Sequence, residues 1–105
     1  MAGIDTDKHP LVLIEWVDAS RLTNGWMDWS DIPDPYQHRC VSVGFLVSEN
    51  EHAKILVPTI GDVENEDNRH TYGGMMIPRS AIIAERRLSS GSAESEVKAK
   101  IALAG

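Results

Sequence analysis

Short apolar runs closed by polar or turn-forming residues divide the chain into strand-sized segments. The first, residues 11–17, is apolar and rich in β-branched side chains, with Glu15 as its only charge. It is too short for an ordinary helix, so it predicts a strand. Similar runs occur at residues 40–48, 54–60, 72–77 and 81–88. The pattern therefore predicts five short strands.

Local signals indicate how these strands follow one another. Gly44 interrupts the run at 40–48 and predicts a bend or bulge in that strand. Polar residues at 49–52 separate this run from the next, so we expect an antiparallel hairpin. Residues 78–80, Pro-Arg-Ser, predict a single 3₁₀ turn before the last strand.

Two polar segments interrupt the strands. Residues 21–39 contain Asn24-Gly25, two prolines and three aromatic residues, which predicts a long aromatic loop with a short helical turn near residues 28–32. Residues 61–71 are rich in Asp, Glu and Asn and predict a second, polar loop without a core of its own.

The two ends of the chain differ from the middle. Residues 1–9 are polar and predict a flexible lead-in. Residues 89–92 form a Ser/Gly joint, and residues 93–104 contain Glu–Lys pairs four positions apart, which favour a C-terminal helix. We therefore expect a lead-in at 1–9, a small β-barrel domain at 10–88, and a linker with a helix at 89–105.

Length and charge narrow the functional classes. The 105 residues suffice for one domain, and the single cysteine, Cys40, excludes an internal disulfide and fits a reducing compartment. No apolar run reaches the length of a membrane helix, and no signal peptide is recognisable, so a cytoplasmic location is expected. The net charge of -6 disfavours generic binding to nucleic acids.

The order of these elements resembles the five-stranded antiparallel barrel of Src-homology-three-like and Sm-like domains. Residues 77–83, Ile-Pro-Arg-Ser-Ala-Ile-Ile, are similar to the short turn and last strand of Sm-like proteins. The resemblance implies a mainly β fold, a small closed barrel, here with a long aromatic loop and a C-terminal helix.

A second resemblance involves short sequence motifs along residues 11–88. These are Trp16 followed by Asp18-Ala19, Gly25-Trp26, the strand Ser-Val-Gly-Phe-Leu-Val at 42–47, and Gly73-Gly74 leading to Ile77-Pro78. They are similar to motifs of short uncharacterised proteins from bacteriophages and prophages. This resemblance implies an accessory protein in the host cytoplasm that counters host defence. By analogy, it suggests a multimeric sponge for nucleotide-derived signals.

Aromatic and cationic side chains in the loops are the candidates for binding a ligand. Flat aromatic faces can stack a nucleobase or anchor a peptide, and a guanidinium group can clamp a phosphate or carboxylate. The predicted ligand-binding residues are Asn24, Trp26, Trp29, Arg39, Arg69, Tyr72 and Arg79. Each also has an ordinary structural interpretation: the aromatic rings can cap the barrel end, and the arginines can be solvated surface residues.

Catalytic and metal-binding signals are weak. Cys40 opens an apolar strand, where a small buried side chain is expected, and the four histidines lack the spacing of zinc motifs. The acidic run at 62–67 lacks the closing glutamate of a calcium loop. Carboxylates at Asp18, Asp28, Asp31 and Asp34 suit turns as well as hydrolysis. We therefore predict no catalytic residue, no metal and no cofactor.

Three functional hypotheses remain open. The leading one is a non-catalytic phage protein, expected to form a homo-oligomer, that sequesters a small anionic nucleotide. The second is a protein-interaction module that inhibits a host protein. The third is a small nucleotide hydrolase.

Overall fold

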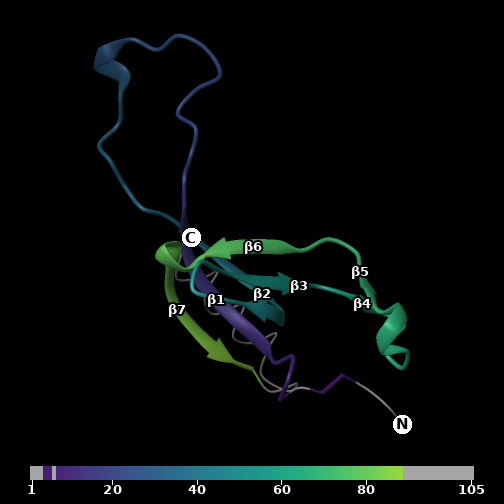
Figure 1. Ribbon diagram of the computed structural model, residues 1–105. Helices are drawn as coiled ribbons and strands as arrows, with labels where there is room; N and C mark the ends of the chain where they lie inside the picture. The colour runs from purple at the N-terminus through teal and green to yellow at the C-terminus, as the bar shows by residue number, and fades with distance from the viewer. Residues whose placement is uncertain (1–3, 6, 89–105) are drawn as a thin grey trace.

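A computed structural model describes residues 4, 5 and 7–88 and shows a mainly β fold (Figure 1). Its main sheet is antiparallel, with the strand order β6-β3-β2-β1-β7. These strands are β1 (Leu11–Asp18), β2 (His38–Glu49), β3 (Ala53–Val57), β6 (Met75–Pro78) and β7 (Ile82–Arg87). The predicted mainly β fold with five antiparallel strands is confirmed.

Shorter elements connect these strands. A separate two-stranded ribbon consists of β4 (Ile60–Gly61) and β5 (His70–Thr71). Three single 3₁₀ turns are η1 (Trp29–Asp31), η2 (Glu66–Asn68) and η3 (Arg79–Ala81). The helical turn expected near residues 28–32 and the 3₁₀ turn expected before the last strand are therefore both present.

The long strand β2 bends and changes partner along its length. Its first part pairs with β1 and its last part with β3, and Gly44 lies opposite Val12 close to this change. A Cβ atom at Gly44 would lie 2.9 Å from the Val57 carbonyl oxygen. The absence of a side chain therefore permits the close approach, and the register of β2 against β3 shifts just after the predicted position, between Leu46 and Ser48.

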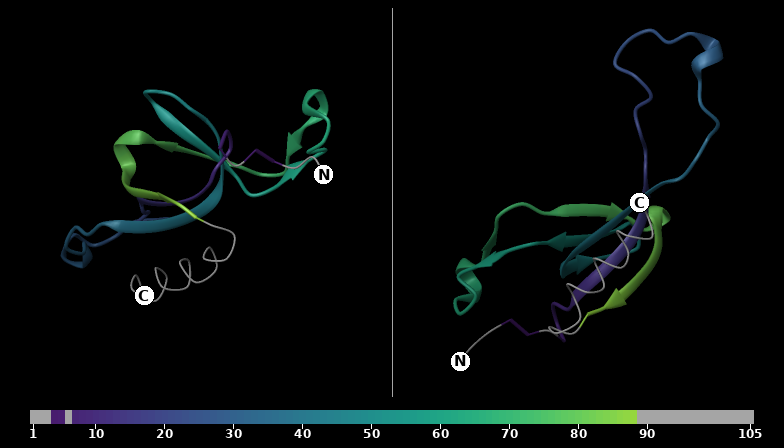
Figure 2. Two further views of the ribbon diagram at one scale, coloured as in Figure 1. Left: turned by 90° about the horizontal axis from the view of Figure 1, so that it is seen from below. Right: turned by 180° about the vertical axis from the view of Figure 1, so that it is seen from behind.

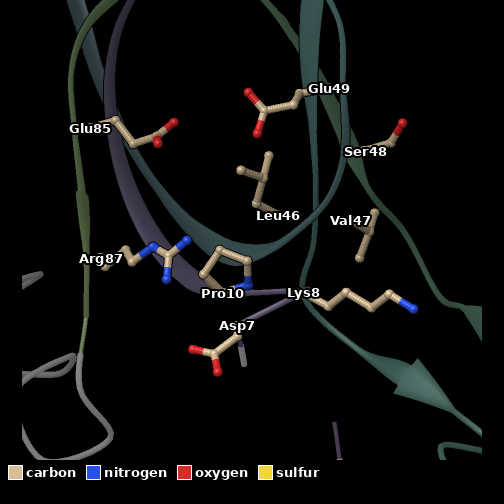
Figure 3. Close-up of a pocket in the computed structure, with 9 residues that line it drawn as sticks. All are labelled: Asp7, Lys8, Pro10, Leu46, Val47, Ser48, Glu49, Glu85 and Arg87. Carbon is tan, nitrogen blue, oxygen red and sulfur yellow. The ribbon is translucent and has the colours of Figure 1, made fainter. Parts of the chain in front are cut away.

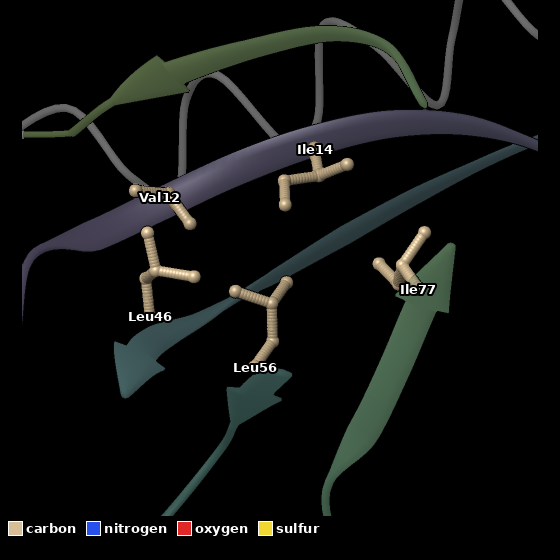
Figure 4. Packing of buried hydrophobic residues seen from close by; sticks show 5 residues of the cluster. All are labelled: Val12, Ile14, Leu46, Leu56 and Ile77. Carbon is tan, nitrogen blue, oxygen red and sulfur yellow. The ribbon is translucent and has the colours of Figure 1, made fainter. Parts of the chain in front are cut away.

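Buried side chains lie on the inner face of this bent sheet, between β1 on one side and β3 and β6 on the other (Figure 4). The cluster comprises Val12, Ile14, Leu46, Leu56 and Ile77. Trp16 packs against it and is half-buried, and its Nε1 donates a hydrogen bond to Ser42 Oγ at 3.0 Å. The indole therefore adds apolar contact while its polar atom is satisfied.

The predicted closed barrel is wrong. β6 and β7 are the two end strands of the sheet, and no backbone pairing joins them in the part of the chain described. β6 has only four residues and ends at Pro78, which has no N–H to donate. Instead, Lys54 of β3 reaches Glu85 of β7, with 2.7 Å between Nζ and Oε1. An ion pair thus spans the two sides that a closed barrel would join by backbone hydrogen bonds.

Two strand ends lie three residues from their predicted positions, and the other ends lie within two residues. The strand expected at 54–60 ends at Val57, because Pro58 lacks an amide hydrogen for the ladder. The strand expected at 72–77 begins only at Met75, because Gly73 and Gly74 have φ angles of 81° and 156°. Ile60, His70 and their neighbours form the separate ribbon instead.

Residues 19–37 form a long loop between β1 and β2 that projects away from the sheet (Figures 1 and 2). Asp18 and His38, which flank it, are paired in the sheet. The loop is therefore an excursion between two adjacent strand ends, and it contributes to the longest dimension of a molecule measuring 61 × 28 × 24 Å.

The lead-in predicted at 1–9 contains a hydrogen-bonded turn just before β1. The Asp5 carbonyl oxygen accepts from the amides of Lys8 and His9, and its carboxylate accepts from the Asp7 amide at 2.9 Å. The linker and helix predicted at 89–105 lie outside the described residues. Within the described part, no helix has the length and apolar character needed to cross a membrane.

Candidate functional site

The loop at 19–37 carries apolar side chains that the rest of the described chain leaves uncovered. Trp26 is fully exposed, at 104%, and Trp29 is 87% exposed. Leu22, Ile32 and Tyr36 are also exposed in the same loop. Exposed large apolar side chains that are close in sequence make this segment a candidate interaction site, and we call residues 19–37 the aromatic loop.

Local hydrogen bonds shape the aromatic loop. Arg21 donates to Asn24 Oδ1 at 3.0 Å, and the Gly25 amide donates to Thr23 Oγ1 at 3.3 Å. The 3₁₀ turn η1 forms where the Ile32 amide donates to the Trp29 carbonyl oxygen. All these bonds join residues of the loop itself, so they present the aromatic rings without drawing them onto the sheet.

The charge of the aromatic loop is negative. It contains three aspartates, Asp28, Asp31 and Asp34, against one arginine, Arg21. An open hollow of about 470 Å³ lies beside Trp26 and is lined by Thr23, Trp26, Met27, Asp28 and Asp31. Because two carboxylates and no cation line it, the hollow suits an apolar or cationic group better than a phosphate.

Two of the predicted anion-binding arginines already have partners in the fold. The Arg79 Nη2 atom lies 2.7 Å from Glu49 Oε1, and its Nε donates to the Asn50 carbonyl oxygen. These contacts attach η3 to the β2–β3 hairpin. Arg69 donates from Nε to the Val63 carbonyl oxygen at 2.8 Å and is half-buried. Arg39 is exposed on β2, opposite Val17 of β1.

The predicted ligand-binding residues do not converge on one pocket. Asn24, Trp26 and Trp29 lie in the aromatic loop, whereas Arg69 and Tyr72 lie at the β4–β5 ribbon. Both views in Figure 2 place the aromatic loop and this ribbon well apart, on different sides of the sheet. Arg39 and Arg79 occupy two further places, on β2 and η3. Each of the pockets described in this subsection contains at most one of the seven.

A charged pocket of about 240 Å³ opens beside Leu46 of the core (Figure 3). It is lined by Asp7, Lys8, Pro10, Leu46, Val47, Ser48, Glu49, Glu85 and Arg87. Glu49 and Glu85 both contact the Lys54 amine, at 3.5 and 2.7 Å, and Glu49 also pairs with Arg79. Because these carboxylates have cationic partners, we interpret them as stabilising the fold.

A second, mainly apolar pocket of about 250 Å³ lies against the β4–β5 ribbon, and we call it the Arg69 pocket. It is lined by Ile4, His9, Val47, Val57, Ile60, Arg69, His70 and Thr71. The Nδ1 atom of His9 is buried and has no hydrogen-bond partner. Sequence alone does not point to His9, because a histidine in a polar segment carries no signal of burial.

The described residues offer little for metal binding or hydrolysis. They contain no group of three or more His, Cys, Asp or Glu side chains placed to hold a metal ion. The Asp18 carboxylate accepts a hydrogen bond from the Ala19 amide at 2.8 Å, as turn-forming aspartates do. Cys40 is half-buried, and its Sγ atom lies 3.9 Å from the His38 carbonyl oxygen.

Comparisons of the chain with protein families, with curated proteins and with solved structures find no significant match. The features of the structure that bear on function are therefore the aromatic loop with the hollow beside Trp26, the charged pocket and the Arg69 pocket.

Proposed function

We propose that the protein is a non-catalytic interaction module that binds another protein through its aromatic loop. The observation that carries this proposal is the exposure of Trp26 and Trp29 on a segment that projects from the sheet. When an exposed tryptophan side chain is covered by a partner, its apolar surface is removed from water, and this favours binding. Tryptophan is also among the residues that contribute most of the binding energy in protein interfaces.

The charge of the loop defines the kind of partner. Three aspartates lie among the aromatic residues, so a complementary surface is an apolar groove with lysine or arginine at its rim. Such a partner would bury the indole rings and leave the carboxylates at the solvated edge. The resemblance of the sequence motifs to phage proteins makes a host protein the expected partner, with inhibition as the consequence.

Sequestration of a small anionic nucleotide is the second candidate, and the fully exposed Trp26 ring favours it because bases stack on such faces. Its phosphates require cations, however, and Arg79 is already paired with Glu49. A second copy of the chain would have to supply them, as in the expected homo-oligomer. The interaction module therefore ranks first.

Capture of a partner by loop variants tests the proposal. The full chain, immobilised, is exposed to lysate of the cells in which it is expressed, beside a Trp26→Ala/Trp29→Ala variant and a Tyr72→Ala control. Tyr72 is 87% exposed but lies outside the loop. We expect the wild type and the control to retain one stoichiometric protein, and the double variant to bind it at least about 100-fold more weakly.

Two outcomes would contradict the interaction module. Retention of the same protein by the double variant would exclude the aromatic loop as the binding surface. Failure to capture any protein, together with binding of a cyclic dinucleotide or a cyclic ADP-ribose isomer that is recovered intact, would favour sequestration. Light scattering on the same sample then reports whether the chain forms an oligomer, which a supply of cations from a second copy requires.

A further inference from the structure

We propose that Asn24, in the aromatic loop, is a modification site at which the chain converts asparagine slowly into aspartate and isoaspartate without an enzyme. This chemistry is separate from partner binding, so it does not depend on the interaction proposed for the loop. Three observations support the proposal: the residue that follows Asn24, the open surroundings of the peptide bond between them, and the hydrogen bond that the Asn24 side-chain oxygen accepts.

The reaction needs only the side-chain amide of Asn24 and the next backbone nitrogen. The Gly25 nitrogen loses its proton and attacks Asn24 Cγ, so that a bond between nitrogen and carbon closes a succinimide ring. The bond from Cγ to Nδ2 breaks, and Nδ2 leaves as ammonia together with a proton equivalent to the one lost. Water then opens the succinimide at either carbonyl, which gives aspartate or isoaspartate. Water is the only co-reactant, and nothing is oxidised or reduced.

Gly25 leaves the attacking nitrogen accessible. Glycine has no side chain to hinder ring closure, and its backbone reaches more conformations than that of other residues. A Cβ atom at Gly25 would meet nothing within 4 Å, so no other segment of the described chain packs against this peptide. The Gly25 amide donates to Thr23 Oγ1 at 3.3 Å and lies outside the strand ladders, and residues 19–26 are all exposed.

Arg21 activates the carbon that is attacked. Its Nη1 atom donates to Asn24 Oδ1 at 3.0 Å. This hydrogen bond from a cation withdraws electron density from the amide carbonyl and stabilises the negative charge that develops on Oδ1 as the nitrogen attacks. No carboxylate of the described residues forms an ion pair with Arg21, so its charge is not neutralised by a neighbour.

The other asparagines of the chain serve as internal controls, because none of them precedes a glycine. A side chain on the following residue hinders the attack of its backbone nitrogen, so these positions should react more slowly. The Asn50 side chain is also held in place, since its Oδ1 accepts from two backbone amides of the β2–β3 hairpin. The three controls are Asn50, Asn65 and Asn68, which precede Glu51, Glu66 and Arg69.

The products change the aromatic loop in two ways. Both replace a neutral amide by a carboxylate, which adds to the negative charge of the three aspartates. Isoaspartate also brings the side-chain methylene into the backbone, so the main chain becomes longer just before Trp26. The exposed Trp26 ring should therefore move, whereas Trp16, which packs against the core, should keep its place.

Ageing of the purified full chain tests the proposal. Samples are held at neutral and at mildly alkaline pH, and mass spectrometry of proteolytic peptides follows each asparagine. We expect the peptide that contains Asn24 to gain the mass difference between an amide and a carboxyl group, at least about tenfold faster than the peptides of the three controls. Chromatography should separate its aspartyl and isoaspartyl forms. The rate should rise with pH, because hydroxide removes the proton of the Gly25 amide.

Three variants identify the groups responsible. Gly25→Ala should slow the conversion of Asn24 at least about tenfold, because the added methyl group hinders the attack. Arg21→Gln should slow it about 2- to 10-fold, as fits the loss of one hydrogen bond to the amide oxygen. Arg39→Gln removes the same charge from an exposed position on β2 and should react as the wild type does.

Nuclear magnetic resonance of the aged wild type adds a local readout. We expect a second indole N–H signal for Trp26 that grows with the isoaspartyl fraction, and a single signal for Trp16. Equal rates at Asn24 and at the three controls would overturn the proposal, as would an unchanged rate in Gly25→Ala. Faster conversion in Arg21→Gln would show that the hydrogen bond from Arg21 protects Asn24 and would overturn the activation assigned to it.

Discussion

At the scale of single residues, Gly44 allows β3 to approach β2 closely because it has no side chain. The strand leaves β1 and joins β3 close to this residue, and the backbone of Val57 approaches it directly. At Trp16 a large side chain is needed instead. Its ring packs against the core, and its Nε1 atom donates a hydrogen bond to Ser42 Oγ. A small residue at the bend and a large one beside the core therefore allow the same sheet to curve and remain packed.

Gly44→Ala should destabilise the fold. The added Cβ would lie 2.9 Å from the Val57 carbonyl oxygen and 3.3 Å from Leu56 Cβ, so the two strands must separate. We expect a loss of about 1–3 kcal/mol in the free energy of unfolding, as for overpacked cores. Urea denaturation measures it.

Gly25→Ala is the matched control for this change. A Cβ at Gly25 meets nothing within 4 Å, and its backbone does not require glycine. The free energy of unfolding should change by at most about 0.5 kcal/mol. Equal losses in the two variants would contradict the role assigned to Gly44.

At the scale of elements, the aromatic loop is separable from the sheet that carries it. None of its residues is buried, and its hydrogen bonds are internal apart from the one that the Ala19 amide donates to Asp18 at the end of β1. Its two ends meet at Asp18 and His38, which face each other across β1 and β2. The sheet therefore positions the loop, but the loop adds no residue to the core.

Replacement of residues 19–37 by Asn-Gly should leave the sheet intact. This dipeptide favours the two-residue turn of antiparallel hairpins, and the register at Asp18 and His38 suits such a connection. A shorter connection also has a smaller loop-closure entropy, so the free energy of unfolding should be unchanged or higher.

Circular dichroism and urea denaturation measure the result, and partner binding should be lost in parallel. Loss of the β spectrum in the shortened chain would show that the loop stabilises the sheet after all.

At the scale of the whole molecule, side chains hold together the two sides of an open sheet. Lys54 has a side chain only 12% exposed and lies between Glu49 and Glu85. Because Glu85 is on the end strand β7, this contact crosses the inner face of the sheet rather than following a strand pair. Partial burial limits screening by salt, so the pair should persist at physiological ionic strength.

Glu85→Ala should lower the free energy of unfolding by about 1–3 kcal/mol, because it removes a partner of the largely buried Lys54 amine. Glu51→Ala is the control, since its pair with His52 is exposed on both sides and should contribute little. Urea denaturation of both variants measures the difference. Similar effects of the two substitutions would argue against an ionic link across the sheet.

The local elements were largely predictable from sequence. Apolar runs indicated the strands, Gly44 indicated the bend, and the polar residues after Ser48 indicated the β2–β3 hairpin, in which Asn50 Oδ1 accepts from the amides of His52 and Ala53. Pro58 and the Gly73-Gly74 pair are also visible in the sequence, but the apolar runs at 54–60 and 72–77 extend across them, so these runs predict strands that are too long. Each of these features depends on neighbours in the chain.

The candidate site was predictable only in part. The aromatic residues were selected because of their type and loop position, and the structure places Trp26 and Trp29 on a projecting surface. The partner of Arg79 was not predictable, because Glu49 lies 30 positions away in the sequence. The burial of His9 was hidden for the same reason, since Val47, Ile60 and Arg69 come to it only in the folded chain.

The sequence by itself determined the β character, the strand order along the chain, the bend and the aromatic loop, because these follow from residue size, turn chemistry and alternation within short segments. Only the tertiary structure decided that the sheet remains open, that Lys54 connects β3 with β7, and that the N-terminal turn completes the Arg69 pocket. Those features depend on distances between segments far apart in sequence, which chain-local patterns do not encode.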